Sequence, residues 1–331
     1  MTPAANDIVG RLAHSPTGAQ HVGNARTYLI AWLSARSQGG RLIFRMEDID
    51  SPRVKPWAAQ QALDDLRWLG LDWDEGPDCG GPYAPYIQTE RLPRYSALLE
   101  ELRRANAIYP CTCTRSDIES AASAPHAGHE GPIYPGTCAG RSAAEADELS
   151  GRPFCWRFRM SFGISEADSA VTFDDLLRGR ETCRPAADLG DFVIAKGNGT
   201  PAYQLAVVAD DHAMGVTEVV RGDDLIPSTF RQLALLRFFG WTAPRYVHLP
   251  LVVGPDGRRL AKRHGDTRIA LLRERGIPPE RLIGRLAHSC GLTDSPAPIA
   301  ARDLMAEFDV ARLNREPWVF TARDWESLAA R

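Results

Sequence analysis

The chain has very little lysine. Among 331 residues only Lys55, Lys196 and Lys262 carry an ammonium group, against 36 arginines. A nucleotide composition that favours arginine codons accounts for most of this excess. Lys262 nevertheless stands as lysine in the basic, glycine-containing stretch PDGRRLAKRHGD. It is therefore a candidate for a role that a planar guanidinium cannot fill.

The chain also lacks long apolar runs. No segment approaches the roughly 18 consecutive apolar residues of a membrane-spanning helix, and no charged and then apolar start precedes a small-residue cleavage site. We therefore expect a cytoplasmic protein without a membrane partner.

Neither sign of charge dominates, and the cysteines do not form an even set. With a net charge of -3, the chain as a whole is not cationic, so a nucleic-acid partner would need a local basic face. Seven cysteines spread over a long chain are not the pattern of a secreted disulfide framework. Free thiols or a bound metal are expected instead.

Strands and helices are predicted to alternate in the first part of the chain. An apolar strand around Ile8 to Leu12 leads through a Pro/Gly turn into a helix, and the strand RLIFRM leads into an amphipathic helix that Gly70 ends. This alternation begins a Rossmann-like, doubly wound parallel sheet, so the fold class is α/β.

The regular pattern is then interrupted and later resumes. The pattern changes over residues 111–190, of which 116–152 show no long period, and this predicts an inserted α+β subdomain. Beyond it, residues 205–208 and 216–220 are predicted as buried strands, and the strand YVHLPLVV runs into the Lys262 loop. After Asp266 only short helices are predicted, and no strand.

Two loops together predict a nucleotide site. HSPTGAQHVGNAR places small residues and His21 in the turn before a helix, whose free N–H groups and dipole favour a phosphate. The Lys262 loop follows a late strand, at the edge where open parallel sheets bind ligands. Its cations would stabilise the charge that moves onto a leaving pyrophosphate. Each loop alone is also compatible with an ordinary turn.

Three cysteines predict a metal site. The CxC pair Cys111 and Cys113 brings two thiolates within reach of one ion, and Cys138 returns after a loop. A tetrahedral zinc site needs one more ligand, for which composition nominates His126 or His129. The alternative is three buried thiols without a metal.

Several ordered stretches resemble the glutamyl branch of the class I aminoacyl-tRNA synthetases. HVGN, starting at His21, and RLAKR, starting at Arg259, are similar to the two nucleotide motifs of that family. RLAHSPTG, RMEDID, QTERLPRY, AYQLAVVADDHAMGVTEVVRGDDL and HLPLVV agree as well, so the resemblance covers roughly residues 9–265. It implies a Rossmann-like fold, ATP with Mg²⁺, and L-glutamate as the amino acid.

The resemblance also implies roles for individual residues. ATP would be bound by His21, Gly23, Asn24 and Lys262, of which His21 and Lys262 would be catalytic. Glutamate would be bound by the following residues: Arg11, Leu12, Ala13, His14, Ser15, Glu47, Tyr203 and Arg221. Glu47 would receive the substrate ammonium, and arginines suit the carboxylates because a guanidinium pairs with them bidentately. For the metal, the resemblance points to Tyr134 as the fourth ligand of one structural Zn²⁺ per chain, beside Cys111, Cys113 and Cys138.

Three positions depart from the family pattern. His14 stands where proline is common, Ala261 replaces the usual serine, and Arg259 replaces the usual first lysine of the second motif. Because His21 and Lys262 are present, we expect these departures to affect the rate more than the chemistry.

The resemblance divides the chain into four predicted parts. These are the first half of the catalytic domain (1–110), an inserted zinc-binding subdomain (111–195), the second half of the catalytic domain with the Lys262 loop (196–265), and a short helical region (266–331). Full glutamyl-tRNA synthetases continue into helical domains that bind the anticodon, and no such domain is expected here.

The short C-terminal region and the CxC...YxxxC insertion together resemble the glutamyl-Q tRNA(Asp) synthetase family. That resemblance implies ATP-dependent, tRNA-independent activation of glutamate. It further implies transfer of glutamate to the queuosine base at the wobble position of the tRNA(Asp) anticodon, by a monomer. Two alternatives stay open: a compact glutamyl-tRNA synthetase that charges a 3' end, and a non-catalytic, zinc-containing RNA-binding paralogue.

Overall fold

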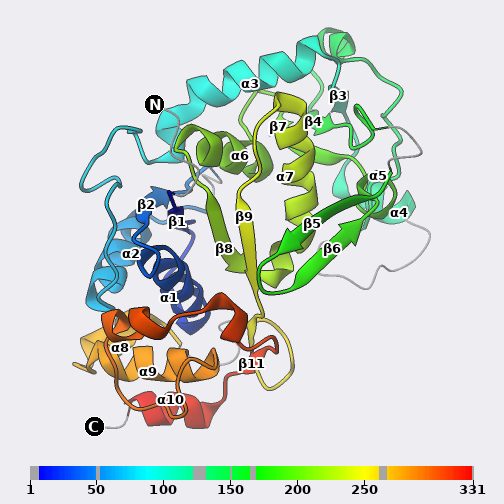
Figure 1. Ribbon diagram of the computed structural model, residues 1–331. Coiled ribbons are helices and arrows are strands. Elements are labelled where there is room, and N and C mark those ends of the chain that lie inside the picture. Colours follow the sequence, from blue (N-terminus) through cyan, green and yellow to red (C-terminus); the bar gives the residue numbers. More distant parts are fainter. Residues whose placement is uncertain are drawn as a thin grey trace.

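The chain begins with the predicted alternation of strand and helix (Figure 1). β1 (Val9–His14) and β2 (Arg41–Met46) pair in parallel, and α1 (Val22–Arg36) makes the crossover between them. The computed structural model describes residues 7–49, 53–121, 132–149, 151–164, 169–260 and 267–329.

A four-stranded sheet in the order β6-β5-β9-β8 lies beside β1. Its strands β5 (Val171–Asp175), β8 (Glu218–Gly222) and β9 (Arg245–Leu249) are parallel, and β6 (Gly179–Cys183) is antiparallel to β5. The Thr217 N–H donates to the Val9 carbonyl over 2.9 Å at the start of β8. The parallel α/β architecture is thus confirmed, and the carboxyl ends of β1, β2 and β8 meet at one edge.

A separate antiparallel sheet, in the order β3-β4-β7, combines one strand of the interrupted region with the strands that flank it. It contains β3 (Ile108–Cys111), β4 (Cys155–Phe158) and β7 (Phe192–Lys196). β5 and β6 lie between β4 and β7 in the sequence, but β5 pairs with β9 and β6 pairs with β5. Segment 111–195 therefore contributes strands to two sheets, and the four-part division of the chain stays a prediction.

Two predicted features are wrong. Residues 205–208 are helical, in α6 (Tyr203–Ala213). Every residue from Leu205 to Asp211 is buried, and a helix surrounded by protein has the continuous apolar run of a buried strand. The C-terminal region also contains a strand, β11 (Trp318–Val319), which pairs with β10 (Val252–Val253). Two residues are too few to produce a sequence period.

The remaining elements cover the sheets. α1 is buried on almost all sides because it packs between the sheet and α9, near the base of the view in Figure 1. None of the helices in the described part of the chain has the length and apolarity needed to cross a membrane. The other helices are α2 (Pro56–Trp68), η1 (Gln88–Arg91), α3 (Leu92–Arg104), α4 (Arg115–Ala121), η2 (Ala143–Leu149), α5 (Pro185–Asp188), η4 (Asp223–Leu225), α7 (Ile226–Phe239), α8 (Ile269–Glu274), α9 (Pro279–Ser289), η6 (Ala301–Glu307), η7 (Val310–Arg312) and α10 (Ala322–Ala329).

Candidate functional site

A cavity of about 470 Å³ opens at the carboxyl ends of β1, β2 and β8. This is the edge at which open parallel sheets bind ligands. Ten residues predicted from the sequence line it: Arg11, Ala13, His14, Ser15, His21, Gly23, Asn24, Glu47, Tyr203 and Arg221. The side chain of Leu12 does not line it, because successive side chains of a strand point to opposite faces and Leu12 is fully buried in the core. Lys262 lies outside the described residues.

His21 caps the helix that starts at the cavity. The Gly23 N–H donates to His21 Nδ1 over 3.1 Å, and the His21 N–H donates to Asn24 Oδ1 over 3.1 Å. Because Nδ1 is an acceptor, the proton of the neutral ring is on Nε2. Burial, assisted by the charge of Arg259, lowers the pKa of His21 to about 4. His21 therefore offers a neutral N–H donor where the backbone of α1 favours a phosphate.

Gly23 follows in the first turn of α1 and allows close packing there. A Cβ atom at this position would lie 3.0 Å from Cε1 of His21, so a larger residue would displace the imidazole.

The Lys262 loop is flanked by residues that contact this region. Before it, Arg259 lines the cavity and forms an ion pair of 2.9 Å with Asp224. After it, the Thr267 carbonyl accepts a hydrogen bond from the Val22 N–H over 3.2 Å. Both flanks of segment 261–266 therefore lie at the cavity or at the start of α1. Ala261 and Lys262 are themselves outside the described residues, and their roles stay predictions.

Two guanidinium groups, those of Arg11 and Arg221, line the cavity. Arg11 Nη1 donates to the Val220 carbonyl over 3.1 Å, and Arg221 Nη2 donates to Thr229 Oγ1 over 2.7 Å. Arg221 Nη1 is buried and has no hydrogen-bond partner among the described residues, whereas Arg11 Nε lies 3.8 Å from the Asp211 carboxylate in an ion pair. An unpaired buried donor costs about 1–3 kcal/mol. Arg221 Nη1 therefore fits an anionic ligand, and a carboxylate suits a guanidinium best.

Glu47 supplies the negative side of the cavity. Its carboxylate lies 2.9 Å from Nη2 of Arg45, and Nη1 of the same Arg45 lies 2.7 Å from Asp211. Arg45 is completely buried, as is Asp210, which pairs with Arg91 over 2.6 Å. Glu47 therefore belongs to a buried charge network and is not one acid of a solvated turn.

The sequence reasoning missed the partners in this network, Arg45, Asp210 and Asp211. A signal was present, because Arg45 stands inside the apolar run of β2 and the two aspartates follow an apolar run in α6. Charged residues in such runs are almost always paired when they are buried.

His14, one of the departures from the family pattern, adds an acceptor to the cavity. The Tyr28 hydroxyl donates to the Ala13 carbonyl over 3.1 Å and lies 3.2 Å from His14 Nδ1. Both contacts are satisfied when Nδ1 carries the ring proton and donates to the Tyr28 oxygen. Nε2 is then the acceptor, and it is buried without a partner among the described residues. A proline has no such acceptor.

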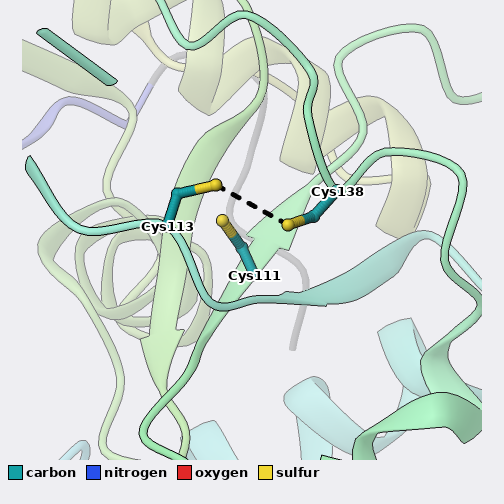
Figure 2. A group of neighbouring side chains, drawn as sticks. All are labelled: Cys111, Cys113 and Cys138. Carbon is teal, nitrogen blue, oxygen red and sulfur yellow. Dashed lines mark hydrogen bonds between the residues drawn. The ribbon is translucent and has the colours of Figure 1, made fainter. Parts of the chain in front are cut away.

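The three cysteines of the predicted metal site lie together (Figure 2). The Sγ atoms of Cys111, Cys113 and Cys138 are all within 4.8 Å of one another, and those of Cys113 and Cys138 are 3.7 Å apart. Two sulfur ligands of one tetrahedral zinc, each at about 2.3 Å, are about 3.8 Å apart. This group can therefore hold one metal ion.

The Tyr134 hydroxyl oxygen lies next to the same three residues. It is 3.4 Å from Cys111 Sγ, 3.9 Å from Cys113 Sγ, and accepts a hydrogen bond of 2.7 Å from the Cys138 N–H. His126 and His129, the other candidates for the fourth ligand, lie outside the described residues. Cys155, which has no metal-ligand spacing in the sequence, stands opposite Cys111 in the β3–β4 pair and packs against the group.

Comparison with known proteins agrees with this site. The family model of the catalytic domain of class I tRNA synthetases (E and Q) matches residues 7–326. The glutamyl-Q tRNA(Asp) synthetase of Rhodopirellula baltica is 51% identical, over 95% of this chain and 97% of its own length. The one from Symbiobacterium thermophilum is 49% identical, over 94% of this chain and 95% of its own length.

A solved structure agrees with the fold. The glutamate tRNA ligase of Elizabethkingia meningosepticum, crystallised in complex with its amino acid, superposes with a TM-score of 0.80 at 28% identity, covering 96% of this chain and 68% of that protein. The family implies glutamate, ATP and tRNA as partners. The chain is therefore a glutamate-related ligase of the aminoacyl-tRNA synthetase type, and it belongs to the class I (E and Q) tRNA synthetase family, in the branch of the glutamyl-Q tRNA(Asp) synthetases.

Proposed function

We propose that this protein activates L-glutamate with ATP, without needing tRNA, and transfers it to the queuosine base of the tRNA(Asp) anticodon. The observation that carries the proposal is that Arg11, Arg221 and Glu47 line one cavity, in which Nη1 of Arg221 is a buried donor without a hydrogen-bond partner among the described residues. A ligand with two carboxylates and one ammonium complements two guanidinium groups and one carboxylate. The names of the relatives supply the nucleic-acid acceptor.

In the first step, an α-carboxylate oxygen of glutamate attacks the α-phosphorus of ATP. A P–O bond forms, the bond to the β-phosphate breaks, and glutamyl-adenylate and pyrophosphate result. The His21 N–H, the start of α1 and Lys262 would stabilise the charge that develops on the phosphates. Arg11, Arg221 and Glu47 would hold the amino acid for in-line attack. Mg²⁺, bound with ATP, would neutralise part of the phosphate charge.

In the second step, a hydroxyl of queuosine attacks the activated carbonyl of glutamyl-adenylate. The new ester bond forms, AMP leaves, and the hydroxyl proton is released. An acyl phosphate anhydride is reactive enough that the step requires no assigned general base.

We further propose that the metal site holds one structural zinc. Cys111, Cys113, Cys138 and the Tyr134 oxygen would be its ligands, and the ion would link β3 to the loop that carries Tyr134 and Cys138. We also propose that the protein is a monomer.

The test is transfer of labelled glutamate, with ATP, to tRNA from cells that make queuosine and to tRNA from cells that cannot. We expect incorporation only into the queuosine-containing tRNA, and glutamate-dependent ATP–pyrophosphate exchange with no tRNA present. Equal incorporation into both pools, removed by periodate treatment of the 3' ends, would instead identify an ordinary glutamyl-tRNA synthetase. No incorporation and no exchange would leave the non-catalytic RNA-binding paralogue.

A further inference from the structure

We propose that His248 and Asp175 are positioning residues that aim Arg221 at a carboxylate of the amino-acid substrate. This inference rests on the proposed function, because it assigns a purpose to two buried residues behind the glutamate site. Neither residue lines the cavity.

Asp175, at the end of β5, is a fixed anion. Its Oδ1 accepts hydrogen bonds from the backbone N–H groups of Leu177, over 2.9 Å, and Arg178, over 2.8 Å. Its Oδ2 lies 3.1 Å from the backbone nitrogen of His248 and 2.7 Å from His248 Nδ1. With so many donors around it, this carboxylate cannot turn to another partner.

The carboxylate determines which nitrogen of His248 is protonated. An ionised carboxylate only accepts hydrogen bonds, so Nδ1 carries the proton and Nε2 presents a lone pair. Arg221 Nε donates to that lone pair over 3.1 Å. His248 is completely buried on β9, with the ring of Tyr246 stacked at 5.8 Å and the ring of Phe173 at 5.9 Å. The ring has no room to flip.

These contacts leave Nη1 of Arg221, with its two N–H groups, for the ligand. Nε is held by His248 and Nη2 by Thr229, while Nη1 has no hydrogen-bond partner among the described residues. The guanidinium plane is thus fixed from behind, which lowers the entropy lost when a carboxylate binds. Asp175 belongs to the interrupted region of the sequence, so that region contributes to the amino-acid site indirectly.

Protonation of His248 would break the arrangement. Burial lowers the pKa of His248, the hydrogen bond to Asp175 opposes this, and the charge of Arg221 lowers the pKa further. The ring is therefore neutral near pH 7. If it became protonated, Nε2 would carry a hydrogen facing the Arg221 donor. Because the pKa lies below the ordinary value of 6.5, affinity for glutamate should fall only on the acidic side of that value.

The test is glutamate-dependent ATP–pyrophosphate exchange by wild type, His248→Leu and His248→Gln. Leucine removes the acceptor, whereas the amide of glutamine keeps one acceptor and one donor. We expect KM for glutamate to rise about 10- to 100-fold in His248→Leu, the range for a lost hydrogen bond to a charged group. We expect a smaller rise in His248→Gln and an unchanged KM for ATP in both. His288→Gln, in α9 and away from the cavity, is the matched control and should behave as wild type.

The pH profile separates positioning from a merely structural role. In wild type, KM for glutamate should rise on the acidic side of pH 6.5, and in His248→Gln this limb should disappear. A profile unchanged in His248→Gln, or equal rises in KM for glutamate and ATP, would overturn the inference. If His248→Leu does not fold, the KM for glutamate of His248→Gln and its pH profile still test the inference. Wild type without any exchange would instead overturn the proposed function on which the inference rests.

Discussion

Burial fixes the protonation state of three histidines in and behind the cavity. It lowers the pKa of His14 and of His21 to about 4, and it also lowers the pKa of His248. Near pH 7 each ring is therefore neutral and has one donor and one acceptor. In the described part of the cavity, an anionic ligand thus meets positive charge from guanidinium groups and not from imidazolium.

Lys262 would add a compact ammonium to the guanidinium groups of the cavity. We expect Lys262→Arg to reduce the rate of ATP–pyrophosphate exchange about 100-fold, as for other single groups that stabilise a transition state. A planar fork cannot meet one phosphoryl oxygen as a point charge does. The thermal midpoint and the affinity for glutamate should not change.

Lys196→Arg is the matched control for this substitution. Lys196 is exposed at the end of β7 and does not line the cavity, so its exchange rate should equal that of wild type. Exchange at the wild-type rate in Lys262→Arg would mean that a positive charge is sufficient at this position, whether an ammonium or a guanidinium carries it.

Among the elements, the β3-β4-β7 sheet is the one that adjoins the predicted metal group of Cys111, Cys113 and Cys138. β3 ends at Cys111, and β4 places Cys155 opposite it. Cys138 and Tyr134 come from a loop without regular structure of its own around them. A metal ion at this group would therefore join the loop to the sheet.

Removal of the metal should loosen this sheet. Because an ion that binds only the folded state stabilises it, we expect a chelator to lower the thermal midpoint by at least about 5 °C. Cys113→Ser should reproduce that loss and should bind less than one zinc per chain by elemental analysis. Cys79→Ser, at an exposed cysteine, is the control and should keep the thermal midpoint and the zinc content of wild type. Less than one zinc per chain in the purified wild type would refute the zinc proposal.

For the whole molecule, the C-terminal helices and the first half of the chain form one core. Side chains of α1, α2, α8 and α9 belong to the same buried cluster. At this contact Asp65 of α2 is completely buried and lies 3.2 Å from Arg273 of α8, but neither carboxylate oxygen accepts a hydrogen bond from a described residue. The contact between α2 and α8 therefore contains a poorly solvated carboxylate.

This carboxylate should make stability depend on pH. Burial raises the pKa of Asp65 to about 7, and the charge of Arg273 only partly opposes this. Between the ordinary value of 3.8 and about 7, the folded state holds a proton that the unfolded state has lost. The free energy of unfolding therefore falls as pH rises through this window. Asp65→Asn carries no charge, so it should be more stable than wild type on the alkaline side of pH 7, by about 1–4 kcal/mol.

Urea unfolding of both proteins at several pH values measures this difference. The two curves should converge as the pH falls below 3.8, where Asp65 is protonated in both states. Asp64→Asn, on the same helix but half-exposed, is the control for removal of a charge from α2. Lower stability of Asp65→Asn at every pH would mean that the ion pair with Arg273 outweighs the cost of burial.

The sequence by itself determined the α/β alternation, the residues around the cavity and the cysteines of the metal group. The alternation depends on local periodicity and the cysteines on a short motif, in which residues close in the sequence act together. The glutamate-binding residues around the cavity were implied by the resemblance to a known family. HVGN forms the cap of α1, and the CxC spacing places two thiols close enough in the chain to bind one ion.

Only the tertiary structure decided features that depend on distant partners. Residues 205–208 have the continuous apolar run of a buried strand because protein surrounds the helix that they form, and β11 exists because β10 lies beside it. Arg45 pairs with Asp211, and Asp175 is linked to Arg221 through His248. These partners are too far apart in the sequence for a periodic pattern to indicate them. Burial then keeps each of the three histidines neutral, and the hydrogen-bond partners of each ring set which nitrogen holds the proton.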